Sequence, residues 1–316
     1  PYKYHCIDEL ENGMYKVLSG SQYSGKFGLL DRDFNEVVEP TYTFLEPVGS
    51  GFVVSTSEFF ERRSVGFMNS DGKITIPLAY SSIRSALDDK VWIYTNNDKS
   101  IGLATFNGKI LIEPCFGKVE PFVNGFAKVN NGYWYEYDED NDSPVVHTIT
   151  EYHEGKWGLI SSEGILILPP IYDSVQVLED TQIIVSRQIP IKSSYSNIHV
   201  SGVTNYQGEL LIKDCSGDYI LASKKYDWQE DFNAEGQSRV YYNGNIGVVN
   251  EKFQQIVTCQ VEGETSEFVL PEEYDWGYNS TSQFVLIEKN GKKGIIDCVN
   301  SYIVIKPVFD QIDVLS

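Results

Sequence analysis

The sequence predicts an all-β fold built from seven similar units. Three observations lead to this prediction: a short glycine-containing pattern recurs along the chain, apolar runs of strand length flank it, and aromatic residues recur in register with it. One such unit is too small to bury its own apolar face, so the units are expected to stack on one another.

The recurring pattern is an anchor glycine followed by two apolar residues and then a polar one, as in Gly158-Leu-Ile-Ser161. The anchors lie 36 to 56 residues apart, or roughly 44 on average. They are Gly28, Gly66, Gly102, Gly158, Gly202, Gly247 and Gly294.

Three short strands are expected in each unit. The first precedes the anchor, as at residues 52–54, and the second contains it. Six residues after the anchor, a glycine such as Gly72 lies in a polar turn where positive φ is easiest for glycine, so a β-hairpin leads to the third strand. A proline such as Pro40 or Pro170 is expected to end that strand, because proline cannot donate to a ladder.

An aromatic residue follows in every unit, and in four units an Asp comes directly after it, as in Tyr172-Asp173. Trp228 and Trp276 each follow such a Tyr-Asp pair, and we expect structural roles for them.

The most regular unit reads Gly155-Lys-Trp157-Gly-Leu-Ile-Ser, then Gly164-Ile-Leu-Ile-Leu-Pro-Pro-Ile-Tyr172-Asp173. This pattern resembles the WG-repeat (KWG) family over almost the whole chain. The resemblance implies an all-β repeat array, found mostly in bacteria as an accessory module of larger proteins, without a recognised active site. Trp157, Tyr172, Asp173 and the anchors would then be structural repeat residues. The fifth and sixth units lack the proline and are degenerate.

Both ends of the sequence fall in the same phase of the repeat, so residues 1–316 are expected to form one repeat domain that begins and ends in mid-unit, as part of a longer protein. Two arrangements are open. One is an open superhelical stack of three-stranded hairpin units. The other is a closed, seven-bladed ring like a β-propeller, whose blades need four strands each. The three strands recognised per unit favour the open stack.

The charge excludes several classes of partner. With 45 acidic and 25 basic residues the formal net charge is −20, which disfavours nucleic acid and anionic lipid surfaces. No apolar run is long enough for a membrane-spanning helix, so no membrane insertion is expected. The oligomeric state is left open.

Five scattered cysteines, without a C-x-x-C pair, are expected to be buried small hydrophobic residues in a reducing compartment, not a disulfide framework. This favours the cytoplasm, with a secreted or surface location as the alternative. They are Cys6, Cys115, Cys215, Cys259 and Cys298.

No catalytic motif is present, and neither a cofactor nor a metal is expected. The segment 138–143 alternates acidic residues as calcium loops do, yet Ser143 and Ile149 stand where such a loop needs Gly and Glu. A solvated acidic loop is the better interpretation.

The longest insertion separates residues 129 and 158, and insertions in repeat proteins gather on the face that binds. It is aromatic first and then acidic, and residues 136–154 contain seven acidic residues and no Lys or Arg. The alternative is that the aromatic residues cover the underside of an extended hairpin. The candidate partner-binding residues are Tyr133, Trp134, Tyr135, Tyr137, Asp138, Asp140 and Asp142.

The sequence therefore predicts a non-enzymatic recognition or scaffold module that binds a protein or peptide partner, possibly basic, through an acidic loop face, within a bacterial sensor, effector or assembly. Carbohydrate binding through Tyr133, Trp134 and Tyr135 on a secreted or surface protein is the alternative. An enzyme with a site assembled from distant units has no supporting pattern.

Overall fold

The computed structural model describes residues 3–22, 24–58, 64–95, 99–139, 147–178, 182–192 and 197–312, with the side chains of 135–150 left aside. These residues form strands and turns, and none of them belongs to a helix that could span a membrane. The chain divides into two compact units, Pro1–Glu179 and Asp180–Ser316. Each unit is described by itself.

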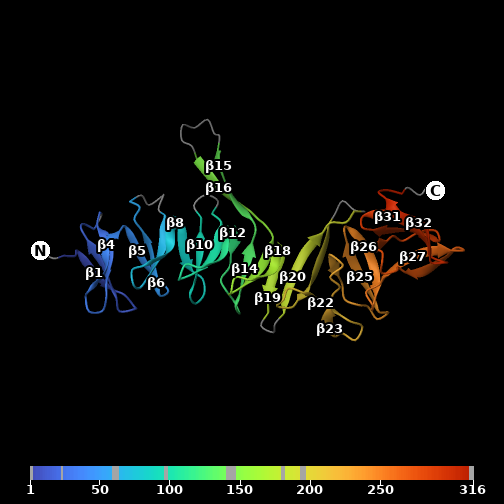
Figure 1. Cartoon of the computed structure of the whole chain (residues 1–316), viewed down its shortest axis with the longest axis horizontal. Helices are drawn as coiled ribbons and strands as arrows, with labels where there is room; N and C mark the ends of the chain where they lie inside the picture. Colours follow the sequence, from blue (N-terminus) through green and yellow to red (C-terminus); the bar gives the residue numbers. More distant parts are fainter. Residues whose placement is uncertain are drawn as a thin grey trace. The chain divides into compact units, whose positions relative to one another are not determined.

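The first unit contains four four-stranded antiparallel sheets that follow one another along the chain (Figure 1). Neighbouring strands in each sheet are consecutive in the sequence, except where an insertion separates β14 from β17. The strands of these sheets are β1 (Cys6–Glu9), β2 (Tyr15–Ser19), β3 (Lys26–Leu30), β4 (Glu36–Tyr42), β5 (Phe44–Val48), β6 (Gly51–Ser55), β7 (Val65–Asn69), β8 (Ile74–Tyr80), β9 (Ser82–Ser85), β10 (Lys90–Tyr94), β11 (Ile101–Thr105), β12 (Ile110–Phe116), β13 (Lys118–Val119), β14 (Phe126–Asn130), β17 (Trp157–Ser161) and β18 (Leu166–Tyr172), and β19 (Ser174–Val177) follows them.

The second unit continues the same antiparallel meander. Within it β20 to β23, β24 to β28 and β29 to β32 pair in chain order. Its strands are β20 (Ile183–Ile189), β21 (Ile198–Thr204), β22 (Leu210–Lys213), β23 (Tyr219–Leu221), β24 (Trp228–Gln229), β25 (Gln237–Tyr242), β26 (Asn245–Asn250), β27 (Gln255–Val261), β28 (Glu264–Val269), β29 (Trp276–Gly277), β30 (Phe284–Lys289), β31 (Lys292–Asp297) and β32 (Tyr302–Phe309).

The all-β prediction is confirmed, each anchor glycine lies in a different sheet, and none of the described sheets closes on itself. The prediction of three strands per repeat is too low, because the sheets that contain the anchors have four or five strands. An additional short outer strand precedes the first expected one, as β5 and β9 do. Such strands are hard to recognise because they are short, and β5 contains Glu46 and Pro47, residues that suit a sheet edge.

The polar residue of the repeated pattern organises the hairpin turn. Asn69 Oδ1 accepts hydrogen bonds from the backbone N–H groups of Asp71 and Lys73, at 3.1 and 2.9 Å. Gly72 has φ +80°, which confirms the prediction of positive φ at this position. In the first repeat Phe34 stands at the equivalent position and adopts φ 61° despite its side chain, so the turn geometry persists where glycine is absent.

The prolines lie inside strands and do not end them, which corrects the sequence prediction. Pro40 belongs to β4, and the pairing of β3 with β4 shifts from Phe27–Tyr42 to Leu29–Val38, which marks a bulge. The bulged backbone fills the space beside the anchor: a Cβ on Gly28 would lie 2.5 Å from the carbonyl oxygen of Val38. The same arrangement occurs at Gly66, Gly102, Gly158 and Gly294.

The two remaining anchors have a different neighbour. A Cβ on Gly202 would lie 2.7 Å from the Trp228 ring, and one on Gly247 would lie 2.6 Å from the Trp276 ring. Each tryptophan comes from the sheet that follows its glycine, and both are buried, at 4% and 2% exposure. The two tryptophans replace the bulge in the fifth and sixth repeats, which lack the proline.

Consecutive sheets within a unit pack face to face. One cluster joins Val53 and Phe67 of sheet β5–β8 to Ile83 and Ile93 of sheet β9–β12. A second cluster in the other unit joins β27 to β30 and β31 through buried aliphatic residues. Each repeat therefore buries its apolar faces by stacking its sheet on the next one, as the sequence predicts.

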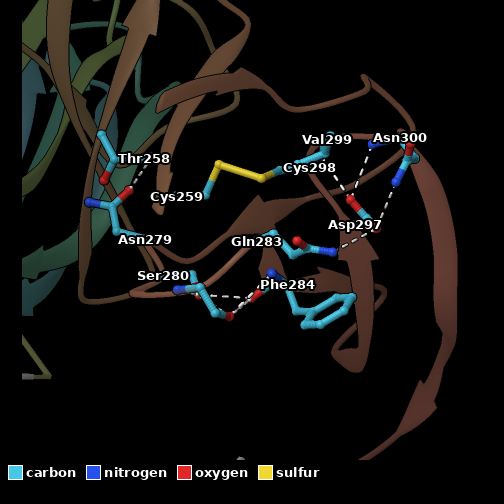
Figure 2. The surroundings of a disulfide bond; sticks show 11 residues. Thr258, Cys259, Asn279, Ser280, Gln283, Phe284, Asp297, Cys298, Val299 and Asn300 are labelled. Carbon is cyan, nitrogen blue, oxygen red and sulfur yellow. Dashed lines mark hydrogen bonds between the residues drawn. A yellow bond between two sulfur atoms is a disulfide. The ribbon is translucent and has the colours of Figure 1, made fainter. Parts of the chain in front are cut away.

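The prediction for the cysteines is wrong. Cys259 of β27 and Cys298, just after β31, form a disulfide although 39 residues separate them (Figure 2). Face-to-face packing of two neighbouring sheets brings them together, a proximity that sequence spacing does not reveal. The other three cysteines are exposed, not buried.

Hydrogen bonds hold the two sides of this disulfide in place. Asn279 Oδ1 accepts a bond from the Thr258 backbone N–H at 3.0 Å, and Ser280 N–H donates to the Thr258 carbonyl at 2.9 Å. On the other side, Asp297 accepts bonds from Val299, Asn300 and Gln283 (Figure 2). Although burial opposes ionisation, these bonds lower the pKa of Asp297.

Candidate functional site

The longest insertion forms a separate hairpin on the fourth sheet of the first unit. Its strand β15 (Tyr133–Glu139) pairs antiparallel with β16 (His147–His153), with Tyr133 opposite His153 and Trp134 opposite Tyr152. The hairpin leaves the sheet between β14 and β17 and projects away from the sheets of that unit (Figure 1). We call it the β15–β16 hairpin.

Asn130 fixes the base of this hairpin. Its side chain is fully buried, and its Oδ1 accepts hydrogen bonds from Gly132 N–H at 2.7 Å, Tyr152 Oη–H at 2.6 Å and Gly155 N–H at 3.2 Å. Its Nδ2 donates to the Gly155 carbonyl at 3.2 Å. One buried amide therefore ties both ends of the insertion together.

Asn131 and two glycines tighten the same base. Asn131 Oδ1 accepts a bond from Lys156 N–H at 2.7 Å, and its Nδ2 donates to the Pro170 carbonyl of β18 at 3.1 Å. A Cβ on Gly132 would lie 2.4 Å from the His153 carbonyl oxygen, and one on Gly117 would lie 2.0 Å from the Gly132 carbonyl oxygen. The backbones are so close that only glycine fits, which restricts movement of the stem.

Trp134 packs against the hairpin itself and remains partly exposed. Its indole Nε1–H donates to the Gly117 carbonyl at 3.1 Å, and its ring centroid lies 5.1 Å from that of Tyr152. The Lys99 ammonium lies 5.7 Å from the indole centroid. Exposure of the side chain is 40%, so Trp134 both anchors the stem and presents a ring surface.

Tyr133 and His153 form the exposed ring pair at the stem. Their centroids are 4.9 Å apart and their planes differ by 13°, while Tyr133 remains 58% exposed. The neighbouring Tyr152 is partly buried, and burial, followed by the negative charge of Glu154, raises its pKa. The stem thus offers neutral aromatic surface beside exposed carboxylates.

The predicted site residues divide into three groups. Tyr133 and Trp134 lie together at the stem; Tyr135, Tyr137 and Asp138 lie further along β15; and Asp140 and Asp142 fall outside the described residues. Sequence reasoning missed Asn130 and His153. The run Asn130-Asn131-Gly132 directly before the insertion was the available signal, because asparagine and glycine at a chain reversal indicate side-chain to backbone bonding.

The repeat residues of this sheet support the hairpin. Trp157 opens β17 opposite Tyr172, and the ammonium groups of Lys118 and Lys128 each lie 5.6 Å from its ring centroid. Asp173 forms an ion pair with Lys156, the residue that follows the hairpin's closing glycine. Among the described residues, no three His, Cys, Asp or Glu side chains gather as metal ligands would, and most of the candidate calcium loop lies outside them.

The first unit also matches a known sequence family. The family profile described as "WG containing repeat" matches residues 27–54, 66–97, 105–134 and 157–180. The first unit therefore consists of WG repeats. All four matches begin in the first unit, where every anchor glycine faces a proline bulge.

No curated protein matches this WG-repeat chain in sequence. Among solved structures, it is similar to the β-propeller domain of the Trilobed protease from Pyrococcus furiosus, with 9% identity, 93% of this chain and 95% of that chain covered, and a TM-score of 0.28. The uncharacterized protein lmo1340 from Listeria monocytogenes EGD-e gives 12% identity, coverage of 99% and 97%, and a TM-score of 0.24. At such TM-scores neither likeness informs the function of this chain.

Proposed function

We propose that this WG-repeat protein is a non-catalytic recognition module that binds a protein or peptide partner with the β15–β16 hairpin. One observation carries the proposal: an insertion projects from a repeat sheet on a base fixed by Asn130, and it presents Tyr133 and Trp134 at 58% and 40% exposure. A rigid base reduces the conformational entropy lost on binding. Exposed tyrosine and tryptophan are the residues that dominate binding energy at protein interfaces.

The charge of the insertion supports a basic partner. Residues 136–154 contain seven acidic residues and no Lys or Arg, in a chain of formal net charge −20. Single-sign charge of this kind accelerates association with an oppositely charged partner, and salt screens the effect. The aromatic stem would then supply affinity, while the acidic residues would supply steering and selectivity. The protein would serve as a scaffold or recognition part of a larger bacterial sensor, effector or assembly.

A deletion can remove the whole hairpin and keep β14 and β17, the strands of the sheet from which it projects. In the variant Δ(132–155), a two-residue Asn-Gly turn joins residue 131 to residue 156, so that β14 and β17 remain neighbours. Peptides are selected on the wild-type chain from a random displayed library, and their affinities are measured on both proteins by calorimetry. We expect selected peptides rich in Lys and Arg, and at least tenfold weaker binding to Δ(132–155).

Two point variants localise the contact. Tyr133→Ala should weaken peptide binding about tenfold, because it removes an exposed ring of the hot-spot type. Tyr219→Ala, which removes a comparably exposed tyrosine of the second unit, should have no effect. Raising the salt concentration from low to physiological should weaken binding further. Equal affinity of wild type and Δ(132–155) would contradict the proposal, and salt-independent affinity would remove its electrostatic part.

Carbohydrate binding is the second candidate, and the exposed, stacked Tyr133–His153 pair is the observation that favours it. A flat aromatic surface suits the apolar face of a sugar ring. A glycan array probed with wild type and Tyr133→Ala separates the two functions, since a glycan signal that disappears in the variant would support carbohydrate recognition. Tyr133 is preferable to Trp134 here, because truncating Trp134 also removes its bond to Gly117.

The cellular location follows from the cysteines only as a proposal. The cytoplasmic location predicted from the sequence is weakened by the Cys259–Cys298 disulfide, since such bonds persist mainly in oxidising compartments. We therefore favour a secreted or surface location. Partition of the native protein between cell and medium, with thiol titration of each fraction, tests this preference.

A further inference from the structure

The second unit contains a cleft of about 650 Å³ that is separate from the β15–β16 hairpin. Four segments of the second unit line it: the end of β20 with the residues just after it, the residue before β24, the turn between β25 and β26, and β30. Its charged residues are Arg187, Lys192, Asp227 and Glu288. A cleft of this size accommodates a small-molecule ligand.

Arg187 has a buried hydrogen-bond donor that the described part of the fold does not pair. Its Nε is buried and has no hydrogen-bond partner among the described residues. Guanidinium is always charged, and burying one of its donors without an acceptor destabilises the fold more than burying a neutral donor does. A carboxylate fits the planar donor pattern of arginine and would satisfy Nε together with a second N–H.

Lys192 provides a second positive charge in the same cleft. Its backbone N–H donates to the Gly244 carbonyl at 2.8 Å, and a Cβ on Gly244 would lie 2.9 Å from Lys192 Cγ. Glycine at this turn therefore allows the lysine to approach it closely. In a chain of net charge −20, two cations in one cleft, neither with a carboxylate partner in the described residues, indicate an anionic group as ligand.

Hydrogen bonds fix the two acidic residues of the cleft in position, and in each carboxylate they use only one of the two oxygens. Asp227 Oδ2 accepts the Asn243 backbone N–H at 2.6 Å, and Glu288 Oε2 accepts from Tyr278 Oη at 2.9 Å and Lys293 Nζ at 3.3 Å. Among the described residues, no backbone or side-chain group donates a hydrogen bond to Asp227 Oδ1 or Glu288 Oε1.

Negative charge surrounds Tyr242, which lies beside the cleft's turn residue Asn243. Burial raises the pKa of the Tyr242 phenol, and the charges of Asp275, Glu288 and Asp227 raise it further. A dianionic phosphate beside so much negative charge would be repelled. A ligand with a single carboxylate and a cationic group matches both halves of the cleft.

We propose that the cleft binds a small zwitterion of the amino-acid or short-peptide class, with its carboxylate on Arg187 and Lys192 and its ammonium group on Asp227 and Glu288. This site is independent of the hairpin and of the partner proposed for it. Free amino acids and short peptides with free termini share this chemistry, and the experiment distinguishes them by length.

The experiment is calorimetric titration of the full chain with each standard amino acid, dialanine and trialanine, followed by capped forms of the best ligand. We expect one of these ligands to bind. Acetylation of its amino group and amidation of its carboxyl group should each weaken binding at least tenfold. Tight binding of amino acids but not of peptides assigns the first source, and the reverse order assigns the second.

Variants link the two caps to their residues. R187M should weaken binding of the uncapped ligand at least tenfold, and amidation of the ligand should then have no further effect. In the double variant D227N/E288Q, acetylation of the ligand should have no further effect. R187K retains the charge but not the forked donors, and should bind with intermediate affinity. R239Q, which alters an arginine paired with Glu230 outside the cleft, is the matched control and should bind as wild type does.

Three results would overturn the proposal: none of the amino acids or peptides binds the folded wild-type chain, capping has no effect, or R187M and R187K both bind as wild type. Circular dichroism and the melting temperature verify that each variant is folded. Should R187M fail this check, the R187K titration and the capping series still decide between the outcomes.

Discussion

The two units solve the same packing problem in different ways. In the first unit all four anchor glycines lie against the bulged backbone of a proline-containing strand. A Cβ on Gly158, for example, would lie 2.6 Å from the Leu168 carbonyl oxygen. In the second unit Gly202 and Gly247 lie against Trp228 and Trp276 instead. The third anchor of the second unit, Gly294, keeps the proline bulge. The glycine is therefore required in both units, but its neighbour is backbone throughout the first unit and a side chain at two of the three anchors of the second.

The pairing of the strands explains the exchange. In the sheet of Gly158, β18 continues past its bulge to place Tyr172 opposite Trp157. In the sheet of Gly247, pairing of β26 with β27 is confined to Val248–Ile256 and Val249–Gln255, so the space beside the glycine is left for the next sheet's tryptophan. A repeat can thus lose its proline and keep its core when the following repeat supplies a large ring.

The largest expected effect comes from removing that ring. Trp276→Ala should lower the free energy of unfolding by about 4 kcal/mol, because it empties a fully buried tryptophan site. Trp157→Ala, which truncates the partly exposed tryptophan of the first unit, should cost about 1 to 2 kcal/mol. Urea unfolding of both variants measures the difference. Equal losses would show that the second unit does not depend on its tryptophan more than the first does.

The disulfide provides the next test, because it belongs to the second unit alone among the described residues. Reduction should destabilise that unit by about 3 kcal/mol, since a closed loop of 39 residues restricts the unfolded chain. Hydrogen exchange, measured by mass spectrometry with and without reductant, should show faster exchange in 182–312 and unchanged exchange in 3–178. The double variant C259S/C298S is the control and should not respond to reductant.

The third test compares the two kinds of glycine neighbour. Gly158→Ala should cost about 2 kcal/mol, because its methyl group meets a backbone carbonyl that is held in a sheet. Gly247→Ala meets the Trp276 side chain, and the smaller ring of Trp276→Phe should recover part of the loss in the double variant. No substitution of a neighbouring side chain should rescue Gly158→Ala. A Gly247→Ala loss that Trp276→Phe leaves unchanged would contradict this assignment.

Much of this fold could be predicted from the sequence because its signals are local. The anchor glycines, the apolar runs and Gly72 in its turn all report on a few consecutive residues, and the structure confirms the strands and the positive φ there. Pro40 was misplaced because a proline inside a strand requires a bulge, and the bulge depends on the partner strand.

What escaped the sequence depends on contacts between sheets. Cys259 and Cys298 meet only because their sheets stack, and Arg187 lines a cleft with Asp227 and Glu288 only because segments of the second unit that are distant in the sequence lie around it. The β15–β16 hairpin lies between these cases. Its length and aromatic content predicted an insertion of interest, but the buried amide of Asn130 that fixes it is recognisable only from the hydrogen bonds it makes.

The smallest expected effect distinguishes two tyrosines at equivalent repeat positions. Burial raises the pKa of Tyr42 in the first unit and raises that of Tyr226 in the second to about 12, from an ordinary value of 10. The unfolded chain therefore loses the Tyr226 proton first as the pH rises, and the stability that the protonated phenol provides is fully present below pH 10 and lost as the pH approaches 12. Tyr226→Phe removes this linkage. At about pH 11 the variant should retain about 1 kcal/mol more of its neutral-pH stability than wild type does, whereas Tyr42→Phe should retain less of such an advantage. Denaturant unfolding at both pH values measures the change, and an identical alkaline loss in wild type and Tyr226→Phe would show that the phenol of the second unit ionises as freely as that of the first.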